Sequence, residues 1–338
     1  MKILNVTRNT TLSAIACLAL VAAGCGDDDE NAIFNDSGVS DDMGSQPDGA
    51  VATTIVDVAS GNAEFSTLVD AVKRAGLVST LSGAGPFTVF APNNQAFKDS
   101  GITDVNAVPV AQLKQILLYH VISGSAIMAS GVKAGAVDSA ADLTFFIGTT
   151  GGVTLNGGNA VTGGANITST DITASNGVIH VIDRVILPPD IPTAAGYGGL
   201  TELVKAVGAA AEITAGTSVL KALQGTGPFT VFAPTNDAFK AITAPSDPAA
   251  LRDVLLYHVV ATSVPSSKIP AKADSLLKNT WGNGVTLLFN TSSGVKVNSA
   301  TVKISDIKTT NGVVHVVDEV RGAGSASAPS SRAQGSGR

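Results

Sequence analysis

The chain has 338 residues, of which 44% are hydrophobic, and its 21 basic and 27 acidic residues give a formal net charge of −6. This length can hold two domains of ordinary size. The acidic balance, with no basic stripe, argues against a nucleic-acid-binding protein and against electrostatic binding to anionic lipid.

Residues 1–24 have the pattern of a secretory signal peptide of the lipoprotein type. Lys2 and Arg8 give a basic start, and the apolar run from Leu12 to Ala23 is shorter than the ~20 residues that a bilayer crossing needs. Ala-Ala-Gly-Cys at its end resembles a bacterial lipobox, although Ala22 stands where Leu is usual. We therefore expect acylation of Cys25. Ordinary cleavage, with Cys25 removed or left free, is the alternative.

The second cysteine, Cys17, lies inside this signal, so the mature chain would keep only Cys25. An exported protein with no cysteine in its domains has no disulfide to form. Its stability has to come from hydrophobic cores, which two domains of this size can provide.

Residues 25–52 are predicted to be an acidic, disordered tether. They contain eight acidic residues and no Lys or Arg. Low hydrophobicity with charge of one sign cannot offset the entropy of ordering, and self-repulsion keeps such a segment extended. Calcium binding by the acidic run is the alternative. From Thr53 onward nineteen basic and nineteen acidic residues remain, so the predicted globular part is close to neutral.

The first predicted domain, residues 53–190, opens with a helical pattern between Ile55 and Leu77. Pro86–Ala91 then reads as a strand that is apolar on both faces and therefore buried. Pro92 ends it, as Pro234 ends the second copy, because proline cannot donate to a ladder. A short helix should follow, capped by Asn93 or Asn94, and by Thr235 or Asn236 in the second copy.

The next helix is predicted to end at Tyr119-His120. Leu113, Ile116, Leu117 and His120 have the spacing of one helix face. We interpret His120 as a buried, hydrogen-bonded imidazole, with a ligand or catalytic role as the alternative. From Leu143 to Leu187 the pattern changes to strands and tight turns, with a glycine-rich hairpin at residues 151–164 and an Asn176-Gly177 turn. Helices first and strands later within one domain predict an α+β fold.

The whole unit then returns. GPFTVFAPNNQAFK (Gly85–Lys98) recurs as GPFTVFAPTNDAFK (Gly227–Lys240), LLYHV recurs at Leu255–Val259, and NGVIHVID recurs as NGVVHVVD at Asn311–Asp318. The matched order predicts a second domain over residues 191–321, followed by a disordered tail at 322–338. In this second copy Asp247-Pro248 marks a helix start. Pro188, Pro189 and Pro192 should make the joint between the domains short and stiff.

These three repeated segments resemble the conserved blocks and the Tyr-His motif of fasciclin-like domains. The resemblance implies two tandem fasciclin-like domains, each a helical set packed on a β-wedge or sheet, in an extracytoplasmic adhesion protein. In animal members the Asp-Ile pair before the second block and the Tyr-His segment are linked to integrin binding. The matching positions are Asp171, Ile172, Asp306, Ile307, Tyr119, His120, Tyr257 and His258. The alternative is that each Asp caps a turn and each Ile packs inward.

No motif of catalysis is found in the sequence. The nucleophile elbow, the Rossmann glycines and the P-loop are absent. All four histidines lie in the repeated motifs, and none has metal-ligand spacing. We interpret His180 and His315, like Pro92 and Pro234, as structural, and we expect no enzyme activity, cofactor or metal. A zinc site that joins His120 and His180 is the alternative.

The sequence therefore favours a lipid-anchored adhesion or interaction module on a bacterial outer membrane or cell surface, facing the periplasm or the exterior. Its partner would be a protein or a matrix polysaccharide. Two alternatives stay open: a periplasmic lipoprotein that binds a small apolar or sugar ligand, and an envelope scaffold.

Overall fold

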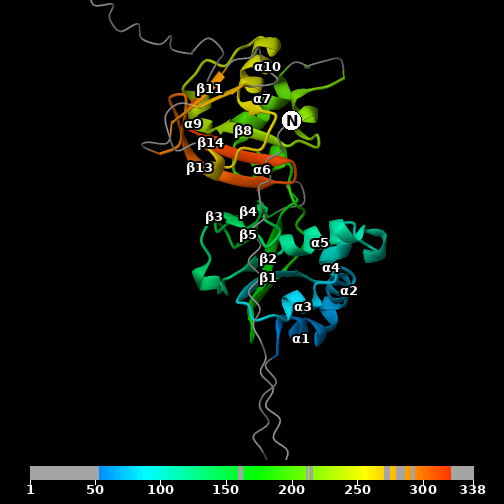
Figure 1. Cartoon of the computed structure of the whole chain (residues 1–338). Coiled ribbons are helices and arrows are strands. Elements are labelled where there is room, and N and C mark those ends of the chain that lie inside the picture. The colour runs from blue at the N-terminus through cyan, green and yellow to red at the C-terminus, as the bar shows by residue number, and fades with distance from the viewer. Residues whose placement is uncertain are drawn as a thin grey trace, which may run out of the picture. The chain divides into compact units, whose positions relative to one another are not determined.

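The structure is a computed structural model, and it describes residues 53–158, 163–210, 212, 216–269, 275–278, 286–290 and 294–320 (Figure 1). Within these ranges two copies of one α+β domain follow each other along the chain. No helix in them combines the length and the apolar character that crossing a bilayer requires.

The first domain has five α-helices and seven strands in its described part. The helices are α1 (Ile55–Ser60), α2 (Ser66–Arg74), α3 (Val78–Leu81), α4 (Asn94–Asp99) and α5 (Val110–Tyr119), with short 3₁₀ turns at Ala63–Phe65, Val105–Ala107 and Ala129–Gly131. The strands are β1 (Phe87–Pro92), β2 (Val121–Ser123), β3 (Gly135–Asp138), β4 (Thr144–Gly148), β5 (Thr154–Leu155), β6 (Ala165–Ala174) and β7 (Gly177–Ile182).

The second domain repeats this order. Its described helices are α6 (Ile191–Tyr197), α7 (Thr201–Ala209), α8 (Val219–Leu223), α9 (Asn236–Lys240) and α10 (Pro248–Tyr257), with a 3₁₀ turn at Ser266–Lys268. Its strands are β8 (Phe229–Pro234), β9 (Val259–Val260), β10 (Ser275–Lys278), β11 (Thr286–Asn290), β12 (Lys296–Val297), β13 (Ala300–Thr309) and β14 (Gly312–Val317).

The two sheets have the same topology. Their strand orders are β2-β1-β7-β6-β5-β4-β3 and β9-β8-β14-β13-β12-β11-β10. In each, one parallel pair, β1 with β7 or β8 with β14, lies among antiparallel pairs. The repeated GPFTVFAP and NGV-x-HV segments are therefore adjacent strands, which explains why they recur together.

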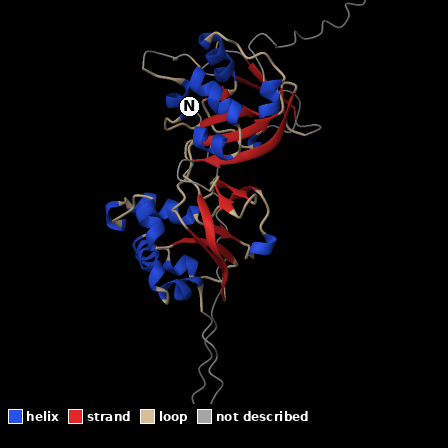
Figure 2. Ribbon diagram, turned by 180° about the vertical axis from the view of Figure 1, so that it is seen from behind, coloured by secondary structure: helices blue, strands red, loops and turns tan. Residues whose placement is uncertain are grey.

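Each domain has two hydrophobic cores, one on either face of the central strands. In β1, Val89 and Ala91 belong to the core shared with the helices, whereas Phe90 belongs to the other core, with Tyr119 and Phe145. The corresponding cores of the second domain contain Val231 and Phe232 respectively. Helices gather on one side of the central strands (Figure 2). The prediction of a strand buried on both faces is confirmed.

The cap predictions are also confirmed. The Ala96 backbone N–H donates to Asn93 Oδ1, and Thr235 and Asp247 cap α9 and α10. Residues 55–77 differ from the expected pattern, because they form separate short helices: Gly61, at the C-cap of α1, ends the first of them. Pro192 is not part of the joint, since it lies in the first turn of α6, where a proline costs no hydrogen bond.

Candidate functional site

His120 and His258 each lie at the C-cap of a helix and are almost fully buried. The Ile186 backbone N–H donates to His120 Nε2 (3.1 Å), so the proton sits on Nδ1, which donates to the Ile116 carbonyl (2.7 Å). His258 Nδ1 makes the same contact with the Val254 carbonyl at 2.8 Å. Burial lowers the pKa of both rings to about 4. Both imidazoles are thus held neutral inside the fold, as expected from their place on the apolar stripe.

His180 and His315 hold the loop that follows β2 or β9. His180 Nδ1 accepts the Asp171 backbone N–H (3.3 Å), and its Nε2 lies 2.8 Å from the Ile127 carbonyl. His315 makes the matching bonds to the Asp306 N–H (3.2 Å) and the Val264 carbonyl (2.8 Å). Because each Nδ1 accepts, each Nε2 carries the proton and donates. Burial lowers the pKa of His315.

Two further side chains fix the same loop. Thr88 Oγ1 donates to the Ser125 carbonyl (2.8 Å) and accepts the Ile127 N–H (2.9 Å), while Asp171 Oδ1 accepts the Ala129 N–H (2.7 Å). We call residues 125–131 the anchored loop of the first domain. Its Ser125, Ala126, Met128 and Ser130 are exposed.

The second domain has the equivalent anchored loop at residues 262–268. Thr230 Oγ1 donates to the Thr262 carbonyl (2.6 Å) and accepts the Val264 N–H (2.8 Å). Asp306 accepts the backbone N–H and the hydroxyl of Ser266. Six anchoring side chains, three in each domain, therefore present the same loop twice.

Asp171 and Asp306 occupy left-handed backbone positions, with φ of 61° and 60°. Each lies where the register of its strand pairing shifts, at a β-bulge. A non-glycine residue in this conformation is uncommon, although Asp and Asn tolerate it best. The bulge turns each carboxylate toward the loop, which the sequence alone did not reveal.

Tyr119 and Tyr257 are buried, with 0% and 4% exposure. Tyr119 donates to the Thr144 carbonyl (3.1 Å) and accepts from Asn156 (3.1 Å), and burial raises the pKa of its hydroxyl. Tyr257 accepts from Asn298 at 3.0 Å. Ile307 is buried and Ile172 is partly buried. These two tyrosines and two isoleucines are therefore buried or partly buried, and none of them is an exposed side chain.

Asn176 and Asn311 connect the helices to the sheet, a role that sequence reasoning missed by assigning Asn176 to a turn only. Asn176 Oδ1 accepts the Ile55 N–H (2.9 Å), and its Nδ2 donates to the carbonyls of Leu81 (2.8 Å) and Gly83 (2.7 Å). Asn311 bonds Ile191, Leu223 and Gly225 in the same way. The recurrence of Asn before Gly in both copies was the available signal.

The repeated Gly-Pro before each central strand has a related cause. Gly85 has φ of +64°, and a Cβ there would collide with the Asn176 carbonyl oxygen. Gly227 meets Asn311 in the same way. Only glycine allows this close approach of two backbones.

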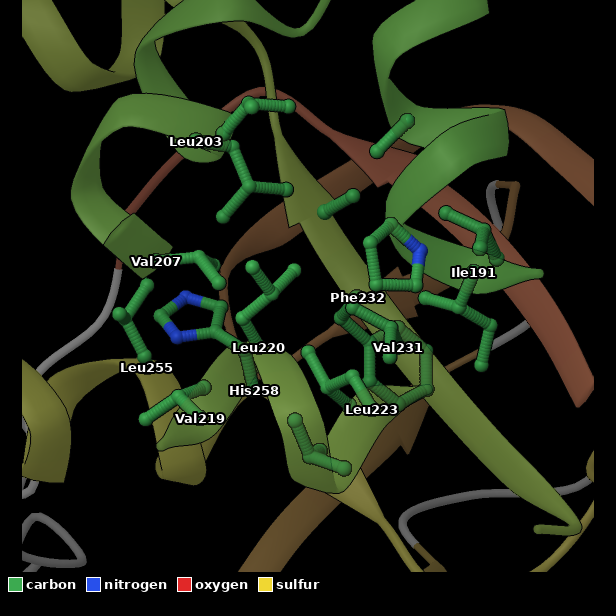
Figure 3. Close-up of a pocket in the computed structure, with 16 residues that line it drawn as sticks. Ile191, Leu203, Val207, Val219, Leu220, Leu223, Val231, Phe232, Leu255 and His258 are labelled. Carbon is green, nitrogen blue, oxygen red and sulfur yellow. The ribbon is translucent and has the colours of Figure 1, made fainter. Parts of the chain in front are cut away.

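Each domain also encloses an apolar cavity between its first helices and its central strands. The cavity of the second domain has a volume of about 80 Å³ and is lined from α6, α7, α8, α10 and β8, with His258 at one end (Figure 3). The first domain has the equivalent cavity beside His120, with a volume of about 40 Å³.

Cys25, the tether and the tail lie outside the described residues, so lipidation and the disorder of these segments stay predictions. In the described ranges no three His, Cys, Asp or Glu side chains are grouped as a metal site.

Two α+β domains with identical topology, the same three anchoring positions and the same buried Tyr-His pair define a tandem-domain protein built by duplication. The sequence matches the Fasciclin domain over residues 63–188 and 200–320. The chain belongs to the fasciclin family.

Curated relatives match different shares of the chain. Protein sll1483 of Synechocystis sp. is 48% identical over 144 residues, which is 41% of this chain and 75% of that protein. Transforming growth factor-beta-induced protein ig-h3 of Sus scrofa is 30% identical over 260 residues, which is 71% of this chain and 35% of that protein. A solved FAS1 domain pair from the insect cell adhesion molecule Fasciclin I matches 77% of this chain and 97% of its own, at 15% identity and a TM-score of 0.44.

Fasciclin domains occur in adhesion and extracellular matrix proteins and are typically extracellular or secreted. The chain is therefore built from modules of an interaction type.

Proposed function

We propose that this chain is a lipid-anchored, extracytoplasmic interaction module that binds a protein or polysaccharide partner at the cell surface or in a matrix, without catalysis. The observation that carries the proposal is the anchored loop. Buried Thr and His groups and a partly buried Asp hold it in both domains, and the loop carries exposed side chains between these anchors. A loop held rigidly on a scaffold loses little entropy on binding.

The buried groups serve the fold and leave little for chemistry. His120, His180 and His315 each use both ring nitrogens in bonds within their domain. A catalytic base has to reach a proton on its substrate, and rings engaged in this way have no nitrogen to offer. This supports the non-catalytic part of the proposal.

Asp171-Ile172 and Asp306-Ile307, with Tyr119-His120 and Tyr257-His258, enter this proposal as the groups that shape the binding surface. The two carboxylates act through the loop that they hold, because their acceptor oxygens bind its N–H groups. A direct contact of these residues with a partner stays a prediction.

The test measures binding to surface-labelled cells of the organism that produces the protein. It compares the full chain with a double Asp171→Ala, Asp306→Ala variant. Asn at both positions is the matched control, since it keeps the acceptor oxygen and tolerates the left-handed backbone. We expect the double Ala variant to lose binding, and the double Asn variant to keep it, at a temperature at which both variants are folded. Equal binding by all three proteins would contradict the role of the loop.

Membrane attachment is tested separately with Cys25→Ser. The variant should be released from membranes, and labelled palmitate should appear on the wild-type protein only. A single acyl chain anchors weakly, so firm attachment requires the multiply acylated form. A wild-type protein that is already soluble would contradict the anchor.

A second candidate function is that of a periplasmic lipoprotein that binds a small apolar ligand. The paired cavities beside His120 and His258 favour it.

A further inference from the structure

We propose that the cavity of the second domain binds the end of an unbranched, uncharged alkyl chain. This inference concerns a ligand inside the domain. It is independent of the partner that we propose for the anchored loop.

The interior of the cavity suits hydrocarbon and not water. Its volume of about 80 Å³ equals roughly three times the ~30 Å³ that one water molecule or a methylene-sized group occupies. A buried water needs two to four polar partners. The only polar side chain in the lining is His258, whose Nδ1 is bonded to the Val254 carbonyl, and the other lining groups are aliphatic or aromatic. The hydroxyl groups of a sugar would find too few partners here.

The mouth of the cavity lies at the surface. Val204 on α7 and Leu220 on α8 both line the cavity, and they are 43% and 37% exposed. Figure 3 shows Leu220 and Leu203 on opposite sides of the open space, with Val207 and His258 beside it. An alkyl chain can enter end-on between the two helices, so that about three methylene-sized groups are enclosed and the polar head of the ligand stays in water.

A comparison of the two cavity entrances explains why we assign the ligand to the second domain. Val72 and Val207 occupy equivalent places on α2 and α7, and both line their cavities. The residue after Val72 is Lys73, which lines the smaller cavity, whereas the residue after Val207 is Gly208. A Cβ at Gly208 would meet nothing within 4 Å. The second domain therefore has a larger cavity without a long charged side chain at its entrance.

The experiment titrates the full chain with straight-chain 1-alkanols from ethanol to octanol and follows the methyl NMR signals of Leu203 and Val207. We expect saturable shifts of these signals, and an affinity that rises about fourfold with each of the first added methylenes, the factor that burial of one CH₂ gives. The rise should then flatten, because later methylenes remain outside the cavity. Glucose should produce no shift.

Two variants locate the site. Gly208→Lys copies the first domain, and it should weaken alkanol binding at least tenfold while the melting temperature stays the same or rises, since lysine favours a helix more than glycine. Lys73→Ala, the matched control, should leave the Leu203 and Val207 response unchanged and give a new response at Val72.

Three results would overturn the inference: no saturable shift with any alkanol, an equal affinity in Gly208→Lys, or an affinity that keeps rising with chain length as in partitioning into aggregates. Binding to cells serves as the separate readout. Gly208→Lys should keep it, and the Asp171→Ala, Asp306→Ala pair should keep alkanol binding, so the two proposals fail independently.

Discussion

The two domains have sheets of the same topology, and they differ in their helical layers. Strand order, the anchored loop, the buried Tyr-His pair and the Asn connector recur in both. The helical layer diverges: three residues (75–77) connect α2 to α3, whereas nine (210–218) connect α7 to α8. The cavity behind these helices is about twice as large in the second domain. The repeated parts are thus those that hold the fold and the loop, and the helical layer is where one copy can acquire a property that the other lacks.

The largest expected effect is the loss of folding stability when the Asn connector of one domain is replaced. It tests whether the two domains unfold independently. Asn176→Ala leaves the Ile55 N–H and the carbonyls of Leu81 and Gly83 without partners, so we expect a loss of about 3 to 5 kcal/mol from the first domain. Asn311→Ala should do the same to the second. Calorimetry of the full chain checks this, and each variant should lower one transition only.

A single transition that moves in both variants would show that the domains unfold together. Residues 53–189, which hold both cores of the first domain, should give a cooperative melt when expressed alone. Aggregation of this fragment would point to the same coupling.

The next largest loss of stability is expected when the buried histidine of a Tyr-His pair is replaced. His120→Ala and His258→Ala should each cost about 2 to 4 kcal/mol, because each removes a packed ring and leaves its backbone partners unpaired. EDTA should not change the melting temperature of the wild type. A wild type that chelator destabilises, with alanine variants that it does not affect, would show that these rings bind a metal.

Acid should act through the same two rings. Their pKa is about 4 in the fold against about 6.5 in an unfolded chain. The unfolded chain therefore binds more protons between these values, so stability is fully present above pH 6.5 and falls as the pH drops toward 4, by about 3 kcal/mol per histidine. Urea melts at pH 7, 5.5 and 4.5 measure this. A His120→Gln variant should show a flatter pH dependence, and an unchanged slope would count against the assignment.

The smallest expected effect concerns the divergent helices. Gly208→Ala should raise the stability of the second domain by about 0.5 to 1 kcal/mol, because Gly208 is exposed on α7 and an added methyl group meets nothing. Lys73→Ala, at the equivalent place in the first domain, should change stability by less than about 0.5 kcal/mol. Thermal melts of the pair check this, and destabilisation by Gly208→Ala would show that the helix is constrained by groups at its surface.

The sequence determined the duplication, the α+β class, the buried central strands, the helix caps and the burial of His120 and His258. Each of these is local: a repeat is read directly, and the spacing of Leu113, Ile116, Leu117 and His120 identifies one face of a helix. The same local reasoning joined residues 55–77 into a single helical pattern and placed Pro192 in the joint. Where one short helix ends and the next begins, as at Gly61, depends on what the flanking helices pack against, and a local pattern does not contain this information.

Only the tertiary structure decided what the polar residues of the motifs do. Thr88, Asp171 and His180 are separated by up to 92 positions, yet they meet on one loop because β1, β6 and β7 are neighbours in the sheet. Asn176 reaches Ile55 across 121 positions. The cavities arise in the same way, from the fit between helices and strands that are distant in the chain. Hydrophobic periodicity fixes which face of an element is buried, whereas the partner of a hydrogen bond and the space left between elements depend on packing in three dimensions.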